Sequence, residues 1–138
     1  MKTQLFIFLL VSTFGLTSSC KKKCDCQVPS QLEGRWQMSR VSGGLAGIDY
    51  TYNPGEVNWY FQQSNNTLYV SNNLDSTDAK HQYTKLETGT YYYQAQSANG
   101  ENIILVNGIS LGVYYFEQDK LLLDDGVASD GMLTEFER

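Results

Sequence analysis

The sequence predicts an all-β fold, an eight-stranded antiparallel up-and-down barrel, and three observations support this prediction. Apolar and polar residues alternate with a period of two in nearly every segment after Leu32, which is the pattern of half-buried strands. Residues typical of turns separate these segments at short intervals. No segment has the spacing of an amphipathic helix. Many short strands joined by short turns are typical of an antiparallel sandwich or barrel, and closing the sheet removes its exposed edges.

Eight segments are expected to form the strands: residues 35–42, 56–63, 67–71, 90–96, 102–106, 113–118, 120–124 and 132–137. The segment 120–124 follows its predecessor so closely that the two are expected to form a hairpin. The polar stretch 72–88 fits a long loop, a short helical turn or a weak strand. The glycine-rich stretch 43–48 is expected to be a loop that serves as a lid over the barrel or as a contact for a partner.

The first nineteen residues have the composition of a secretory signal peptide. Lys2 supplies a positive charge, residues 5–11 form an unbroken apolar run, and small residues lead into Cys20. The apolar run is far shorter than the roughly 20 residues that span a bilayer as a helix. Residues 1–19 are therefore expected to be removed from the mature protein.

The cysteine that follows these small residues points to a lipid anchor. The stretch around Cys20 resembles the cleavage box of bacterial lipoproteins, in which the cysteine becomes the lipid-carrying N-terminus. This resemblance implies lipidation of Cys20 and a tether over residues 20–31, where Lys21, Lys22 and Lys23 would lie next to the headgroups. The alternative is ordinary secretion with an incidental cysteine.

Cys24 and Cys26 complete the cysteine content of the chain. A Cys-x-Cys pair rarely reaches disulfide geometry, and no second cysteine pair is present to complete a metal site. The two residues are expected to belong to the tether, or to form an intermolecular or strained disulfide in an oxidising compartment.

The charge of the chain is distributed unevenly. It contains 15 acidic and 10 basic residues, and the segment before residue 32 holds four of the lysines and one aspartate. Residues 32–138 therefore hold 14 acidic and 6 basic residues, a net charge near −8. Such a domain is not expected to bind nucleic acid, which requires a basic surface.

Four sequence pieces resemble the lipocalin-like domains of small bacterial lipoproteins. They are "LEGRW" at 32–36, "YNPGEVNWYF" at 52–61, "TGTYYY" at 88–93 and "DGMLTEFER" at 130–138. The first contains the Gly-x-Trp that opens the first strand in the lipocalin superfamily. The resemblance implies a lipocalin-like barrel over residues 32–138.

Three residues are expected to have structural roles in that barrel. Gly34 would permit close backbone approach where the first strand enters, and Trp36 would plug the closed end. Arg138 has the same parity as Phe136 on the last strand, which neighbours the first strand in a closed barrel. Arg138 is therefore expected to lie over Trp36 in a cation–π contact, a pair common in the superfamily.

Aromatic residues are the candidates for a ligand site at the opposite, open end of the barrel. Aromatic walls with a few hydroxyl groups suit small apolar or amphipathic ligands. The candidate residues are Tyr50, Tyr52, Trp59, Tyr91, Tyr93 and Tyr115. The alternative is that aromatic residues of one parity fill the core, because parity alone does not show which face is inward.

Catalysis is not expected. The chain has one histidine, His81, no cysteine within 32–138 and no glycine-rich phosphate loop. The acidic turn residues lack the spacing of a calcium loop, so no metal and no cofactor are expected. Asp75-Ser76-Thr77 resembles an O-glycosylation motif of some Gram-negative bacteria, with Ser76 as acceptor.

The expected function is that of a membrane-anchored, non-catalytic lipoprotein that binds a small apolar or amphipathic ligand. The alternative is a structural or protein-interaction module, similar to an inhibitor, with a filled core. The expected location is the cell envelope, anchored to the outer membrane with the domain in the periplasm or at the cell surface.

Overall fold

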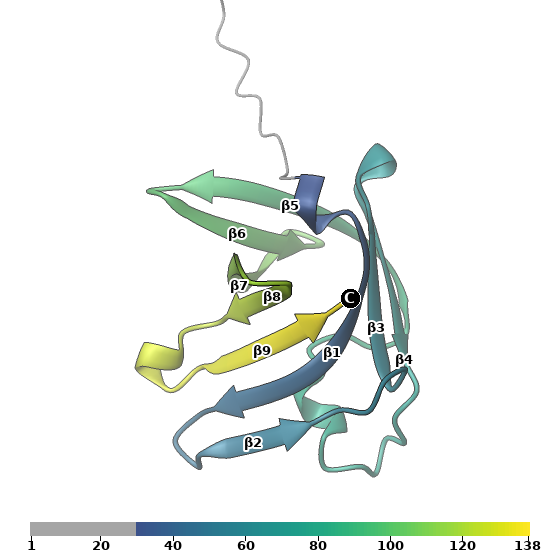
Figure 1. Cartoon of the computed structure of the whole chain (residues 1–138), viewed down its shortest axis with the longest axis vertical. Coiled ribbons are helices and arrows are strands. Elements are labelled where there is room, and N and C mark those ends of the chain that lie inside the picture. The colour runs from purple at the N-terminus through teal and green to yellow at the C-terminus, as the bar shows by residue number, and fades with distance from the viewer. Residues whose placement is uncertain (1–29) are drawn as a thin grey trace, which may run out of the picture.

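Eight antiparallel strands close into a barrel in the computed structural model, which describes residues 30–138 (Figure 1). The sheet in these residues has nine strands, of which all but β2 form the barrel. They are β1 (Gly34–Gly43), β2 (Ile48–Thr51), β3 (Val57–Gln62), β4 (Thr67–Asn72), β5 (Gly89–Ala98), β6 (Glu101–Val106), β7 (Ile109–Glu117), β8 (Lys120–Asp124) and β9 (Met132–Glu137). Short 3-10 turns are η1 (Ser30–Leu32), η2 (Gln63–Asn65), η3 (His81–Tyr83) and η4 (Val127–Ser129). The turn η1 thus begins within the segment 20–31 that was expected to be tether.

Strand order follows chain order from β3 to β9, and β1 closes the ring by pairing with both β3 and β9. Trp36 of β1 is the register partner of Trp59 in β3. Met38 of β1 is the partner of Phe136 in β9. The predicted eight-stranded up-and-down barrel is confirmed, and all eight predicted strands belong to it.

Strand β2, which is not part of the closed ring, was not predicted. Residues 40–43 of β1 pair with β9 along one edge and with β2 along the other, and residues 34–37 carry β3 on that second edge. The stretch 43–48, expected to be a loop, is instead the end of β1, a tight turn and the start of β2. The turn contains a bond from the Gly47 amide to the Gly44 carbonyl at 3.0 Å.

Strand β7 begins at Ile109, earlier than the predicted 113–118. A bulge between β6 and β7 breaks the alternation there, with Ile104 opposite Gly112 and Leu105 opposite Ser110. Gly112 has φ +131°, and a β-carbon at this position would collide with the backbone carbonyl of Asp124. Both facts favour glycine. Because glycine has no side chain, the alternation of apolar and polar residues is interrupted here, and the first part of the strand could not be predicted from it.

Gly34 is required for a different reason from the one predicted. Its φ is +109°, and no atom lies within 4 Å of the place where a β-carbon would be. The expected close backbone approach is therefore wrong. The positive φ alone favours glycine where η1 leads into β1.

Side chains of one parity fill the barrel interior. Each strand sends alternate residues inward, and neighbouring strands keep these residues in register. The buried apolar side chains of the barrel strands that belong to the core are Trp36, Met38, Val41, Val57, Trp59, Phe61, Leu68, Val70, Tyr93, Ala95, Ile104, Val106, Tyr114, Leu121, Leu123 and Phe136. This set forms one continuous core.

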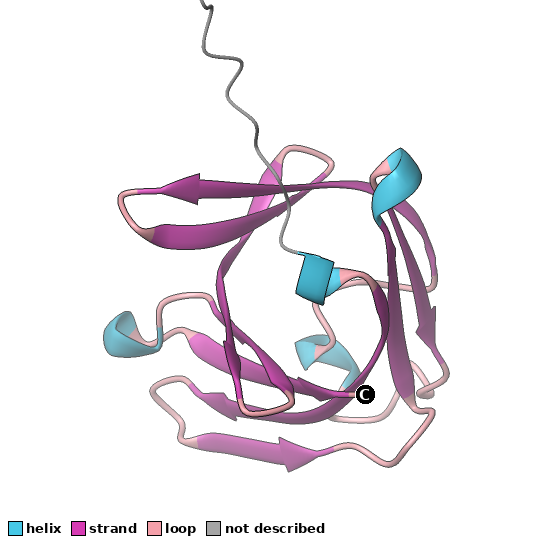
Figure 2. Ribbon diagram, turned by 45° about the horizontal axis from the view of Figure 1, so that its top comes forward, coloured by secondary structure: helices cyan, strands magenta, loops and turns pink. Residues whose placement is uncertain are grey.

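Both ends of the barrel are covered. Figure 2 looks into the ring of strands, where η1 lies over it in this view, and Leu32 of η1 is fully buried in the core. At the other end, the connection 73–88 includes η3 and packs Leu74, Tyr83 and Leu86 against the core. The stretch 72–88 is thus the end of β4 followed by a long loop with one short helical turn, and the end expected to be open is closed by it.

Candidate functional site

Two of the predicted ligand residues lie in the centre of the core. Trp59 and Tyr93 are fully buried. The Trp59 ring centroid lies 4.8 Å from that of Phe136, and the Tyr93 centroid lies 5.0 Å from that of Phe61 in an edge-on contact. These distances are those of packed aromatic pairs, so both side chains contribute to core packing.

Among the described residues, polar atoms of four buried side chains have no hydrogen-bond partner: Asn58 Oδ1, Trp59 Nε1, Tyr93 Oη and Thr134 Oγ1. Burial is the main reason that the pKa of Tyr93 rises to about 12. A buried polar atom without a partner destabilises the fold relative to an apolar atom of the same shape. The core is therefore closely packed, but some of its polar atoms form no hydrogen bond.

Tyr50 and Tyr52 lie at the end covered by the connection 73–88. The ring of Tyr50 contacts that of Tyr83 at 5.5 Å between centroids, and the Tyr52 hydroxyl donates to the Lys80 carbonyl at 3.1 Å. Burial raises the pKa of Tyr52 above its usual value, and nearby carboxylates add to the effect. The two tyrosines hold this loop against the barrel.

An ion pair secures the same loop. Lys80 Nζ lies 2.7 Å from Glu56 Oε2, and both side chains are largely buried. Burial by itself would raise the pKa of Glu56, but hydrogen bonds from Lys80 and Asn53 outweigh burial and lower the pKa. The charged form of Glu56 is therefore the one that the fold stabilises.

The remaining two predicted ligand residues lie elsewhere. Tyr91 is half-buried, and its hydroxyl donates to the Glu87 carbonyl at 2.9 Å. Tyr115 is 40% exposed on the outer side of β7. The six predicted ligand residues are thus divided among the core, the covered end and the outer wall, and they do not line one cavity.

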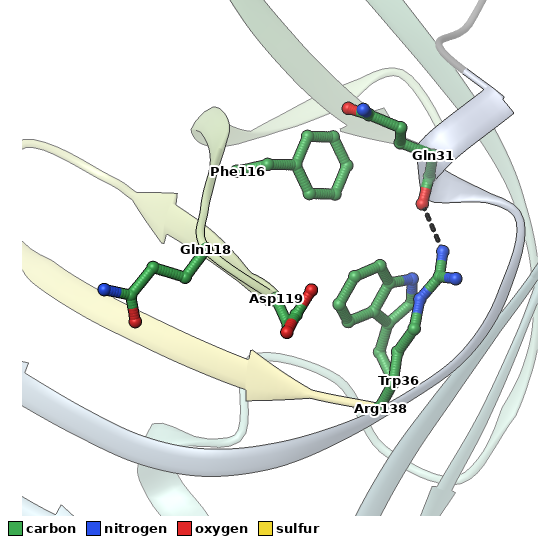
Figure 3. A pocket seen from close by; sticks show the side chains of 6 residues that line it. All are labelled: Gln31, Trp36, Phe116, Gln118, Asp119 and Arg138. Atoms are coloured by element: carbon green, nitrogen blue, oxygen red, sulfur yellow. Dashed lines mark hydrogen bonds between the residues drawn. The ribbon is translucent and has the colours of Figure 1, made fainter.

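The predicted structural pair meets at the η1 end of the barrel (Figure 3). The guanidinium of Arg138 lies 4.5 Å from the centroid of the Trp36 ring. Trp36 Nε1 donates to the Leu32 carbonyl at 2.9 Å, and the ring packs on Phe116 at 5.8 Å between centroids. The contact joins the beginning of β1 to the residue that follows β9.

A hollow of about 310 Å³, the mouth pocket, opens beside this pair. Its lining residues are Gln31, Trp36, Phe116, Gln118, Asp119 and Arg138. Figure 3 shows the Trp36 and Phe116 rings with Gln118 and Asp119 on one side of them and Gln31 and Arg138 on the other. An apolar floor with a few polar groups is the usual composition of a small-ligand site.

A second candidate surface lies on the outside of the barrel. Tyr60, Tyr69 and Tyr92 come from the adjacent strands β3, β4 and β5 and are 43%, 40% and 50% exposed. Tyr60 is the register partner of Tyr69, with ring centroids 6.1 Å apart. Between β4 and β5, Thr67 is the register partner of Tyr92, and Tyr69 is the partner of Thr90. Tyr92 is therefore diagonal to Tyr69.

This surface, here called the tyrosine face, comprises the three tyrosines and the outward side chains around them: Gln62, Thr67, Ser71, Thr90 and Gln94. None of these side chains is charged, although residues 32–138 carry a net charge near −8. Exposed Arg35, the register partner of Tyr60, lies at the margin. Aromatic enrichment with depletion of charge is typical of the centre of an interface.

The sequence contained the signal for the tyrosine face, although the tyrosine face was not among the predicted sites. Tyr60 lies between Trp59 and Phe61, and Tyr92 lies between Tyr91 and Tyr93. Only one parity of each strand faces inward. The inward position of Trp59 and Tyr93 therefore determines that Tyr60 and Tyr92 point outward.

Metal-ligating side chains do not cluster within residues 30–138. No cluster of three or more His, Cys, Asp or Glu side chains that would hold a metal ion occurs in this range. His81 Nε2 lies 3.3 Å from Glu87 Oε2 on the surface of the 73–88 loop. In the same range, no helix is long and apolar enough to cross a bilayer.

Of the predicted modification sites, only Ser76 lies within the described residues. Cys20, Cys24 and Cys26 lie outside the described residues. Ser76 is exposed in the loop 73–88. The neighbouring Thr77 is also exposed, and its hydroxyl donates to Asp75 Oδ1 at 2.7 Å.

Comparisons of the chain with protein-family models, with curated proteins and with solved structures return no match. The barrel is therefore established by its strand pairing. The resemblance to lipocalin-like domains of lipoproteins stays a prediction from the four sequence pieces.

Proposed function

We propose that this protein is a membrane-anchored, non-catalytic binding module that contacts a macromolecule through the outer wall of its barrel. The observation that carries the proposal is the tyrosine face, where three exposed tyrosines from adjacent strands lie among uncharged side chains. Tyrosine supplies a large and rigid contact area that is both apolar and able to form hydrogen bonds.

The packing of the core supports a surface site over an interior one. Trp59, Phe61 and Tyr93 are fully buried and in ring contact with one another or with neighbours. A ligand at the centre would have to displace these side chains, and the cost of opening a packed core is several kcal/mol. Binding on the outside requires no such rearrangement.

The anchor belongs to the same proposal. Acylated Cys20 followed by three lysines would hold the domain at the outer membrane, in the periplasm or at the cell surface. The acidic domain would be held away from an anionic membrane by its own charge. The outer wall would then be available to a partner in the cell envelope.

Photo-crosslinking in the native host tests the proposal. A benzophenone amino acid, which inserts into nearby C–H bonds, replaces Tyr69 in the full chain, and Tyr115 in a matched control. We expect a discrete adduct from position 69 and none from position 115. The absence of adducts at position 69, or the same adducts at both positions, would contradict a specific role for the tyrosine face.

A second candidate function is favoured by the mouth pocket. Its aromatic floor of Trp36 and Phe116 and its polar rim fit a small amphipathic ligand. A fluorescent fatty-acid-like probe should then bind the purified mature protein. Gln118→Trp, which fills the pocket, should abolish this binding. Gln96→Trp, at an exposed position of β5, should not. Probe binding unaffected by Gln118→Trp would exclude the mouth pocket as the site.

A further inference from the structure

We infer that the tyrosine face binds a neutral glycan chain, an inference that rests on the proposed function and names its partner. The flat C–H surfaces of sugar rings pack on aromatic ring faces, and their hydroxyl groups form hydrogen bonds with amide and hydroxyl side chains. The tyrosine face presents both kinds of group together. It contains three exposed rings and, around them, two glutamines, two threonines and a serine.

The spacing of the rings suits a chain of several sugar units. Adjacent strands of a sheet lie about 4.8 Å apart, and the Tyr60 and Tyr69 centroids are 6.1 Å apart. Tyr92 continues the row on the next strand, diagonal to Tyr69. The three rings therefore form a row across β3, β4 and β5, with roughly one ring for each successive sugar unit.

The charge pattern selects against other ligands. A polyanion such as nucleic acid or an acidic polysaccharide would meet a domain with a net charge near −8 and, at the face, the single marginal cation Arg35. A second copy of the chain would bring two such acidic bodies together. A basic partner would find no carboxylate among the side chains of the face. A neutral ligand meets none of these difficulties.

The shape of the face favours a glycan over a protein partner. Protein interfaces are dominated by anchor side chains that fill pockets in the partner surface. The mouth pocket and a second hollow of about 240 Å³, lined by residues of β6 and β7 and by the chain after β8, lie on other parts of the barrel. Exposed rings on the outer wall of the barrel suit a ligand that stacks on aromatic ring faces.

Cross-strand tyrosine pairs also stabilise sheets by a few tenths of a kcal/mol to about 1 kcal/mol, so the test must separate binding from folding. Threonine retains β-propensity and a hydroxyl group but removes the ring. Phenylalanine retains the ring but removes the hydroxyl. The matched control is Tyr115→Thr, which alters an equally exposed tyrosine on β7, outside the tyrosine face.

The first experiment measures binding by calorimetry. The mature protein in phosphatidylcholine nanodiscs is titrated with four neutral polysaccharides (mannan, dextran, laminarin and xylan) and with polygalacturonate as the acidic comparison. We expect at least one neutral polysaccharide to bind and polygalacturonate not to bind. The triple variant Tyr60→Thr, Tyr69→Thr, Tyr92→Thr should lose about tenfold or more in affinity, with its fold verified by near-UV circular dichroism.

The variants give the result that would overturn the inference. Tyr115→Thr should bind like the wild type, and the triple phenylalanine variant should stay within about threefold of it because stacking is retained. Glycan binding that survives the triple threonine variant would place the site elsewhere. Stronger binding of polygalacturonate than of every neutral polysaccharide would contradict the argument from charge.

The crosslinked adduct at position 69 separates this inference from the proposed function. After proteolysis, the peptide that carries position 69 is expected to keep an added mass made of sugar units, which acid hydrolysis releases as monosaccharides. An adduct that consists of peptide alone would overturn the glycan inference and leave the proposed surface function intact. The absence of both an adduct and neutral-glycan binding would overturn both.

Discussion

Arg138 covers the ring of Trp36 with its guanidinium 4.5 Å from the ring centroid, and its Nη2 donates to the carbonyls of Gln31 at 2.6 Å and Glu33 at 3.2 Å. One side chain thus joins the residue after β9, the first strand and the turn η1. Because β1 and β9 close the barrel, this contact stabilises the closure at its η1 end.

The first prediction concerns this pair. Trp36→Ala should lower the free energy of unfolding by about 3–5 kcal/mol, because it leaves a large cavity in the core. Arg138→Ala should lower it by about 1 kcal/mol through the lost ring contact and hydrogen bonds. Urea unfolding of both single variants and the double variant should show a coupling of roughly 0.5 kcal/mol or more. Strict additivity would mean that the two side chains do not interact in solution.

The second prediction concerns acid stability and the loop 73–88. The folded-state pKa of Glu56 is lowered, so its contribution is present above the unfolded value of about 4.3 and is lost as the pH falls through the folded value. Glu56→Gln should destabilise the protein by about 1–2 kcal/mol at pH 7. As the pH falls through the folded-state pKa of Glu56, this difference should shrink toward zero.

Melting temperatures of the wild type and Glu56→Gln across pH 2–7 provide the measurement. Glu117→Gln, at an exposed position of β7, is the control and should have little effect at any pH. A difference between wild type and Glu56→Gln that stays constant down to pH 2 would show that the charge on Glu56 is not what holds the loop.

The third prediction concerns the core hydroxyl of Tyr93. Its hydroxyl has no hydrogen-bond partner, so Tyr93→Phe should stabilise the protein by about 1 kcal/mol at pH 7. Burial raises the pKa of Tyr93 to about 12. Its contribution to stability is therefore complete below the unfolded value of about 10 and is lost as the pH rises through 12. Tyr93→Phe should accordingly tolerate alkali better in urea unfolding, and destabilisation at pH 7 would reveal a hydrogen-bond partner in solution.

The fourth prediction concerns the anchor. Wild-type protein from a bacterial host should partition with membranes and carry acyl chains on Cys20, as mass spectrometry of the N-terminal peptide would show. Cys20→Ser should yield unlipidated soluble protein or an uncleaved precursor, whereas Cys24→Ser should remain in the membrane fraction. An unmodified wild-type N-terminus that begins at another residue would contradict lipidation.

The period-two alternation was enough to predict the strands of the barrel. Segments such as 56–63 and 67–71 alternate clearly, because each strand faces the core on one side and solvent on the other. The eight barrel strands followed from this pattern and from short turns, whereas the choice of an up-and-down barrel over a sandwich rested on the resemblance to lipocalin-like domains. The pair Trp36 and Arg138 was predicted from strand parity together with the resemblance to lipocalins.

Three local features could not be predicted from the alternation of apolar and polar residues. The short strand β2 is recognisable only through its pairing with residues 40–43 of β1, which a linear pattern does not contain. The bulge at Gly112 breaks the period and hid the first part of β7. Gly34 is explained by a backbone angle of φ +109° that arises where η1 meets β1.

The sequence by itself determined that this chain is an all-β barrel with a likeness to lipoproteins at its N-terminus, because alternation and turn chemistry are local properties. The tertiary structure decided which parity faces inward. Closing the sheet placed Trp59 and Tyr93 in the core and Tyr60 and Tyr92 on the outer wall. It also brought Lys80 to Glu56 and closed the far end of the barrel. Burial depends on which strands meet, and strands far apart in the chain meet only when the barrel closes.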